Sequence, residues 1–165
     1  MQGYLLKKQQ IDQMPGQDKS HYLNPEAQRN NKSLGDLTGL SGLGFHIIRV
    51  APGKWSTETH VHYYEDECAY VLEGTGQVRI GEQLYAIEAG DFIGYRANGL
   101  PHNMQNTGNQ DLVCIVVGQR LPHEVADYPV LKKRLYKNVS RDWELVDLEQ
   151  IDYPPRGKVS DQEKS

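Results

Sequence analysis

Residues 53–74 read GKWSTETHVHYYEDECAYVLEG, and this stretch sets the expectations for the rest of the chain. It holds two histidines one residue apart, His60 and His62, followed by an acidic run and an apolar run. Residues i and i+2 of a β-strand point to the same face, so a strand through Val61 would direct both imidazoles into one space. A carboxylate five residues after His62, on the next strand, can return to that space. Two neutral imidazoles and a carboxylate are a common ligand set for a divalent metal ion.

Composition places the chain among ordinary single-domain proteins, with 165 residues and 18.7 kDa, enough to bury a core. The formal net charge is -4 and no block of Lys and Arg occurs, so no nucleic-acid partner is expected. The first ten residues, MQGYLLKKQQ, lack an apolar signal core, and no run of 18 apolar residues occurs, so neither secretion nor a membrane span is expected. Two cysteines, Cys68 and Cys114, make no disulfide framework, which favours a cytoplasmic protein with free thiols.

Short strand-like segments separated by turn signals recur from Phe45 onward. They are expected at 45–51, 56–62, 67–73, 76–80, 83–88, 91–95, 102–106 and 111–118. Glycine-containing turns such as Gly74-Thr75-Gly76 separate them, and this spacing is typical of an all-β sandwich or barrel. The continuously apolar run LVCIVV at 112–117 predicts a strand that is buried on both faces.

The segments on either side of this β region differ in texture. Residues 7–33 are polar and are interpreted as an arm or surface loop, ordered against a sheet or a second subunit. On the other side, LKKRLYKN at 131–138 is compatible with a short helix or a surface loop, and residues 143–148 with an amphipathic segment packed on the barrel. The tail from Tyr153 contains Pro-Pro and charges and is expected to be frayed. We therefore predict an N-terminal arm at 1–43, a barrel at 44–118 and a C-terminal extension at 119–165.

A second histidine-containing stretch, GDFIGYRANGLPHNMQN at 90–106, completes the pattern, because His102 begins a predicted strand and can also point inward. The two stretches together resemble the paired motifs of the cupin superfamily, whose fold is a double-stranded β-helix or jelly-roll barrel. The first motif of that family, usually written G-x5-H-x-H-x3-4-E-x6-G, appears here with one extra residue in its first gap, as Gly53, His60, His62, Glu67 and Gly74.

The second family motif is usually written G-x5-P-x-G-x2-H-x3-N, and Gly90, Gly99, His102 and Asn106 match it with one extra residue before Gly99. Arg96 stands where the family has proline, which could alter the loop before His102 but not the ligand itself. The resemblance covers roughly residues 44–118.

The resemblance implies a single divalent transition metal ion and a small-molecule ligand or substrate, with four metal ligands: His60, His62, Glu67 and His102. Mixed nitrogen and oxygen ligation suits Zn, Mn, Fe, Ni or Co and does not choose among them. The alternative is that the three histidines are ordinary polar residues at strand ends. Some single-domain relatives are described as sugar-phosphate isomerases, although the fold hosts many chemistries. Together with the polar arm, the resemblance also predicts a homodimer.

The carboxylate ligand has three candidates in a row, Glu65, Asp66 and Glu67. Glu67 begins the apolar run and has the motif spacing to Gly74, whereas Asp66 leaves one residue too many. Glu67 could also orient a histidine and not touch the metal. Cys68 follows it and should point to the opposite face, while Cys114 is interpreted as core.

Four residues are candidates for binding a substrate: His46, Tyr64, Arg96 and Met104. A guanidinium at Arg96, at the rim of the expected cavity, could hold a carboxylate or phosphate bidentately; the alternative is a surface arginine paired with an acid. Tyr64 and Met104 share strand parity with the histidines, and His46 is either packed or lines the pocket. The two remaining histidines, His21 and His123, lie in loop-like segments and are interpreted as solvated.

No catalytic residue is identified, since the sequence contains no G-x-S-x-G elbow, P-loop or H-E-x-x-H helix. The favoured hypothesis is a metal-dependent enzyme, an isomerase or an Fe(II) dioxygenase-type oxygenase, acting on a small polar metabolite such as a sugar or sugar phosphate. A second hypothesis is a non-catalytic protein that binds or senses a small molecule, because no second acid or base stands beside the ligands. A third is a structural metal site that stiffens the barrel.

Overall fold

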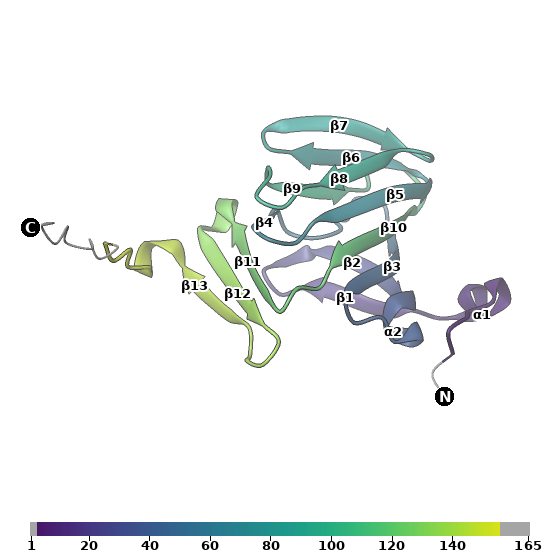
Figure 1. Ribbon diagram of the computed structural model, residues 1–165. Coiled ribbons are helices and arrows are strands. Elements are labelled where there is room, and N and C mark those ends of the chain that lie inside the picture. The colour runs from purple at the N-terminus through teal and green to yellow at the C-terminus, as the bar shows by residue number, and fades with distance from the viewer. Residues whose placement is uncertain (1–2, 156–165) are drawn as a thin grey trace, which may run out of the picture.

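The computed structural model describes residues 3–155, and the all-β prediction is confirmed (Figure 1). The largest sheet has six antiparallel strands, in the order β1 (Gln17–His21), β2 (Asn24–Ser33), β3 (Leu43–Val50), β10 (Leu112–Gln119), β5 (Glu67–Glu73) and β8 (Phe92–Tyr95). A three-stranded sheet completes the jelly-roll barrel, in the order β7 (Gln83–Glu88), β6 (Thr75–Ile80) and β9 (His102–Gln105).

A four-stranded sheet lies beside the barrel, in the order β13 (Glu144–Asp147), β12 (Lys133–Asn138), β11 (His123–Tyr128) and β4 (Val61–His62). The helices are short: α1 (Lys8–Gln13), α2 (Leu34–Thr38), and the 3-10 turns η1 (Pro129–Leu131) and η2 (Leu148–Gln150). Within residues 3–155, none of them is long and apolar enough to cross a bilayer.

The core lies between the six-stranded and three-stranded sheets, where the inward-facing side chains of alternating strand positions meet. Val50, Val71 and Leu112 are completely buried there, as is Cys114. The run predicted to be buried on both faces is buried over Leu112 to Cys114 and half-buried after that. This core holds β3, β5 and β10 side by side, and these strands carry the floor of the cavity described below.

The strand expected at 56–62 shrinks to the two residues of β4, Val61–His62. The residues before it form bends whose amide groups bond to other parts of the chain: Trp55 N–H to Glu26 O, and Ser56 N–H to Met104 O. These contacts between distant segments leave no partner strand for residues 56–59. The sequence pattern alone could not reveal this, because it reports alternation but not which neighbour takes each hydrogen bond.

The segment interpreted as an arm or loop contains two strands of the main sheet. β2 pairs with β3, setting Asn31 opposite Ile48, and β1 pairs with β2. Only Ala27 and Asn31 are fully buried in these strands. The segment is polar because one of its faces meets solvent and the other lines a polar cavity, so the usual apolar signal of a strand is missing.

The C-terminal expectations also change in detail. Residues 133–138, within the stretch expected as a short helix or loop, form strand β12, which pairs with β11 on one side and β13 on the other. The segment expected to pack on the barrel becomes β13, the edge strand of the four-stranded sheet. The tail expected to be frayed from Tyr153 falls outside the described residues beyond position 155.

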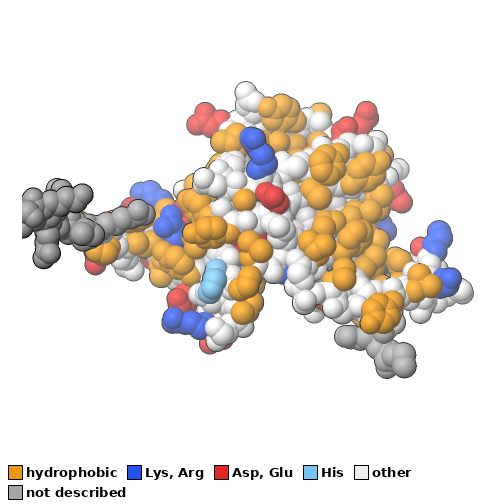
Figure 2. All heavy atoms as spheres, in the orientation of Figure 1, with side chains coloured by type: hydrophobic (Ala, Val, Ile, Leu, Met, Phe, Trp, Pro, Cys, Tyr) orange, Lys and Arg blue, Asp and Glu red, His pale blue; other side chains and the backbone are white. Residues whose placement is uncertain are grey.

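Large apolar side chains also remain exposed outside the core. Tyr70 on β5 and Phe92 on β8 are direct cross-strand partners, and Phe92 is 67% exposed. Leu72 shares the face of Tyr70 and is also exposed. Figure 2 shows one face of the molecule on which hydrophobic side chains gather. Contiguous apolar surface of this kind is typical of a contact with another macromolecule.

Candidate metal centre

Three strand segments bring four side chains together at one end of the barrel. His60 and His62 come from β4 and the residue before it, His102 opens β9, and Glu67 opens β5. The backbones of His60 and His102 form a bridge, with N–H to O distances of 3.1 and 2.8 Å. Each of the four residues offers one ligand atom, and these atoms all lie within 4.8 Å of one another.

Backbone carbonyls orient two of the imidazoles. His60 Nδ1 lies 2.8 Å from Glu58 O, and His102 Nδ1 lies 3.2 Å from Leu100 O. A carbonyl can only accept, so in neutral rings these contacts place the proton on Nδ1 and leave Nε2 with its lone pair. His102 Nε2 is buried and has no hydrogen-bond partner among the described residues. The His102 ring is held by stacking on Tyr95, with centroids 3.8 Å apart.

Electrostatics keep the three histidines neutral. Burial, reinforced by the neighbouring imidazoles, lowers the pKa of His60 to about 3, of His62 to about 4 and of His102 to about 3. Burial raises the pKa of Glu67 to about 7; Arg29 acts against this shift and Glu65 adds to it. Three neutral imidazoles, an orphaned buried Nε2 and a carboxylate fit a divalent ion with mixed nitrogen and oxygen ligands.

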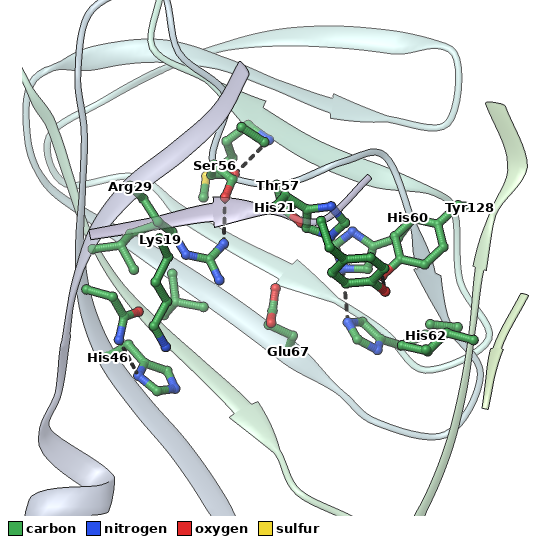
Figure 3. A pocket seen from close by; sticks show the side chains of 18 of the residues that line it. Lys19, His21, Arg29, His46, Ser56, Thr57, His60, His62, Glu67 and Tyr128 are labelled. Atoms are coloured by element: carbon green, nitrogen blue, oxygen red, sulfur yellow. Dashed lines mark hydrogen bonds between the residues drawn. The ribbon is translucent and has the colours of Figure 1, made fainter. Parts of the chain in front are cut away.

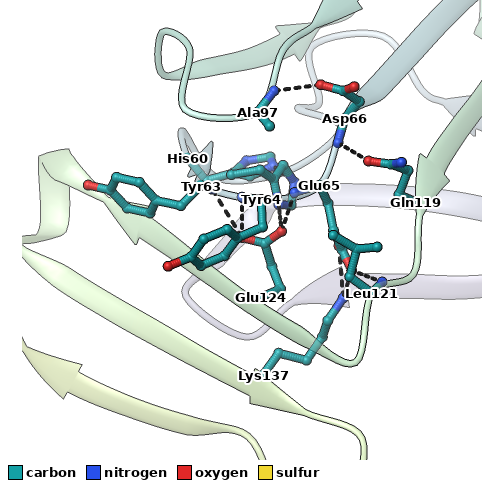
Figure 4. Close-up of polar contacts among 11 residues, drawn as sticks. His60, Tyr63, Tyr64, Glu65, Asp66, Ala97, Gln119, Leu121, Glu124 and Lys137 are labelled. Carbon is teal, nitrogen blue, oxygen red and sulfur yellow. Dashed lines mark hydrogen bonds and ion pairs between the residues drawn. The ribbon is translucent and has the colours of Figure 1, made fainter.

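The acidic run before β5 is divided among three different roles (Figure 4). Glu65 is buried and pairs with Lys137 at 2.7 and 2.8 Å, and Asp66 accepts the N–H of Ala97. Glu67 alone of the three joins the group of three histidines. The burial and the hydrogen-bond partners of these three carboxylates therefore distinguish their roles, whereas the sequence could rank them only by their spacing to Gly74.

Glu124 on β11, which sequence reasoning missed, organises the turn after His62. Its carboxylate accepts the N–H groups of Tyr63, Tyr64 and Glu65, at 3.0, 3.4 and 2.6 Å (Figure 4). It also lies 3.9 Å from His62 Nδ1. His62, Glu65 and Glu124 form a second group that could hold a metal, but both carboxylates are already engaged, one by Lys137 and one by the three amides.

The histidine group opens into a cavity of about 420 Å³ between the six-stranded sheet and the four-stranded sheet (Figure 3). Met104 and His46, two of the four predicted substrate-binding residues, line it. Arg96 and Tyr64 do not. Arg96 follows the buried Tyr95, so strand parity turns it outward, and it is exposed. Tyr64 is 58% exposed in the turn whose backbone Glu124 holds.

Several other residues of the cavity were not recognised as site residues from the sequence: Lys19, His21, Arg29, Glu124, Tyr128 and Lys137. The interpretation of His21 as a solvated loop residue is wrong, because it ends β1, lines the cavity and stacks on Tyr22 with centroids 4.6 Å apart. Burial accordingly lowers the pKa of His21. A possible signal was the two-residue spacing of Lys19 and His21, and of Arg29 and Asn31.

Known proteins share part of this sequence. A model of the cupin domain family matches residues 46–118. A Thermotoga maritima protein named Oxalate-binding protein is 32% identical over 98 residues, which cover 59% of this chain and 71% of that protein. The chain belongs to the cupin family. Its fold and its paired histidine motifs therefore agree with the resemblance seen in the sequence.

Solved structures similar to this cupin include two described as sugar phosphate isomerases. A putative sugar phosphate isomerase from Acidithiobacillus ferrooxidans is 46% identical, with a TM-score of 0.89 over 93% of this chain and 97% of that chain. A sugar phosphate isomerase of the cupin superfamily from Silicibacter pomeroyi is 24% identical, with a TM-score of 0.77 over 87% of this chain and 94% of that chain. At that lower identity the similarity establishes the fold alone.

The metal-free cupin is expected to lose stability as the pH falls below about 6.5, the ordinary histidine pKa. Unfolding returns His60, His62 and His102 to that pKa. Between pH 6 and 5 the unfolded chain therefore binds protons on these imidazoles and the folded chain does not. Glu67 opposes this, because its raised pKa lets the folded chain bind a proton first. The net uptake on unfolding between pH 6 and 5 should be at most about two protons from this group.

Urea denaturation of chelator-treated protein at pH 7.5, 6 and 5 measures this dependence. The same free energy of unfolding at pH 7.5 and pH 5 would contradict the prediction.

Proposed function

We propose that this cupin binds one divalent transition metal ion through His60, His62, Glu67 and His102, and that it acts as a metal-dependent enzyme on a small polar metabolite such as a sugar or sugar phosphate. The observation that carries the proposal is the convergence of three neutral imidazoles and a carboxylate in the wall of a cavity. Isomerisation is the favoured reaction, supported by the 46% identity to the putative sugar phosphate isomerase.

A bound divalent ion would polarise a carbonyl and orient two neighbouring oxygens of the substrate. The chain itself supplies a tyrosine hydroxyl in the same cavity. Tyr128 lines the cavity with its ring 6.1 Å from that of His60, and its hydroxyl lies 2.7 Å from that of Tyr22. Burial raises the pKa of Tyr128, so its hydroxyl keeps its proton. When the Tyr22 hydroxyl is the donor of the pair, that of Tyr128 can donate a hydrogen bond to a substrate oxygen.

Binding without turnover is the second candidate function. It is supported by the 32% identity to the protein named Oxalate-binding protein. Such a role would need the same ligands and the same cavity, but no group that moves a proton between substrate atoms.

One experiment separates these functions. Tag-free protein is stripped with a chelator and reloaded in turn with Zn, Mn, Fe(II), Co and Ni. Each form is then mixed with an aldose phosphate, and ¹³C NMR follows the appearance of the ketose phosphate. Interconversion that requires a metal and is lost in His62→Ala supports the enzyme. Saturable binding of the sugar phosphate with every metal, but no interconversion, supports a binding protein.

We also propose that the cupin is a cytoplasmic homodimer. The exposed apolar positions Tyr70, Leu72 and Phe92 give a second copy a surface to cover. Light scattering at micromolar concentration tests the oligomeric state, and a monomeric mass would rule the dimer out.

A further inference from the structure

Basic side chains from three adjacent strands converge on the wall of the cavity opposite the histidines: Lys19 of β1, Arg29 of β2 and His46 of β3 (Figure 3). Lys19 and Arg29 are direct cross-strand partners, so their side chains leave the sheet on the same face. In Figure 3, Glu67 lies between these basic residues and the pair His60 and His62. The cavity thus has a basic end and a histidine end.

Arg29 is held in place but keeps an unused donor. Its Nη1 donates to Ser56 O at 2.5 Å, while its Nε is buried and has no hydrogen-bond partner among the described residues. Burial lowers the pKa of Arg29, and the nearby carboxylate of Glu67 opposes this shift. A buried charged group with an unsatisfied donor is costly, so an anion held against the guanidinium from the cavity would be stabilised there.

His46 is positioned as a third donor. Asn31 Nδ2 lies 3.3 Å from His46 Nδ1, and the amide as placed donates to the ring. Burial, together with Arg120, lowers the pKa of His46, so the ring is neutral at pH 7. A neutral ring that accepts at Nδ1 carries its proton on Nε2, which lies beside Gly44 and the Arg120 guanidinium at the basic end of the cavity.

The charges of the cavity are unbalanced in favour of cations. Among residues 3–155, neither Lys19 nor Arg29 forms a salt bridge, whereas Glu65 is paired with Lys137 and Glu124 with three backbone amides. A divalent ion on Glu67 would take up the remaining carboxylate. The two cations would then face the cavity without a counter-charge among the described residues, and an anionic ligand would supply one.

We propose that Lys19, Arg29 and His46 form an anion subsite that binds the phosphate group of a phosphomonoester, with the rest of that molecule extending toward the histidine group. This inference rests on the proposed function, since it specifies which end of the substrate is charged. A phosphomonoester carries up to two negative charges and three terminal oxygens, which match two cations and three donor side chains. A carboxylate carries one charge and would leave one cation unpaired.

Isothermal titration calorimetry with inorganic phosphate, on chelator-treated protein, tests the subsite without the metal. Arg29→Gln should weaken phosphate binding about tenfold or more, and Lys19→Gln about threefold or more, since each removes one charged donor. Lys19 is largely exposed, so its variant folds even if the buried Arg29 variant does not. The matched control is Arg49→Gln, because Arg49 lies on β3 facing away from the cavity and pairs with Asp111. It should leave binding unchanged.

The outcomes separate this subsite from the metal proposal. Phosphate binding that is as tight in Arg29→Gln and Lys19→Gln as in the wild type would overturn the subsite, as would acetate binding as tightly as phosphate. His62→Ala should lose the metal and keep its affinity for phosphate. If no metal binds to the wild type, yet phosphate affinity depends on Arg29 and Lys19, the subsite stands and the metal-dependent function fails.

Discussion

Replacing both His60 and His102 with alanine is expected to reduce the bound metal from about one ion per chain to less than about a tenth of that. The two imidazoles are half of the four possible ligands, and their Nδ1 atoms are already committed to backbone carbonyls. Alanine supplies no replacement ligand, and water would have to take both positions. Elemental analysis of tag-free protein, purified without chelator, measures the change directly.

A matched control is available in His123→Ala. His123 is exposed on β11 and contacts Asn138, outside the histidine group, so this variant should keep its metal. Wild-type and control protein should also melt at a higher temperature with metal than without it, because a ligand that binds only the folded chain stabilises it. Equal metal content in the double variant and the wild type would show that these residues do not bind the ion.

Asn106→Ala is expected to destabilise the folded chain by about 3 kcal/mol or more, because one buried and two part-buried backbone groups lose their partner. The Asn106 side chain is completely buried. Its Nδ2 donates to Val50 O at 2.7 Å and to Gln110 O at 2.8 Å, and its Oδ1 accepts from Gly108 N at 2.9 Å. The residue therefore ties the end of β3 to the loop that leads into β10. Urea denaturation followed by circular dichroism measures the loss.

Asn109→Ala is the control for that measurement. Asn109 lies in the same loop, but its side chain is exposed, so the substitution should change the free energy of unfolding by no more than about 0.5 kcal/mol. Similar small losses in both variants would mean that water replaces the Asn106 amide at little cost.

The sequence identified the histidine group because its chemistry and its geometry are both local. His60 and His62 are two residues apart on one extended segment, and alternation alone places them on one face. The barrel was predictable for the same reason: its apolar alternation and its turns repeat at short spacing. The identity of the fold and the grouping of His60, His62, Glu67 and His102 could be anticipated at this level.

The rest of the cavity depends on which strands pair with each other, and short sequence patterns do not reveal this pairing. Lys19 and Arg29 are set side by side only when β1 folds back on β2, and both strands are too polar to be recognised as strands. Arg96 was placed at the rim by its nearness to His102 in sequence, but one step of strand parity after the buried Tyr95 turns it to solvent.

Much of the cavity wall comes from two parts of the chain that carry none of the four grouped residues, one before residues 60–102 and one after them. Lys19, Arg29 and His46 come before residues 60–102, and Tyr128 comes after them. Under the proposed function, reactivity and selectivity are therefore encoded in different parts of the chain. Substitutions in the strands that line the rest of the cavity can change the ligand that fits there, while the four proposed metal ligands stay the same. Two proteins that share the histidine pattern need not share a substrate, and the polar flanks are where such a difference would be found.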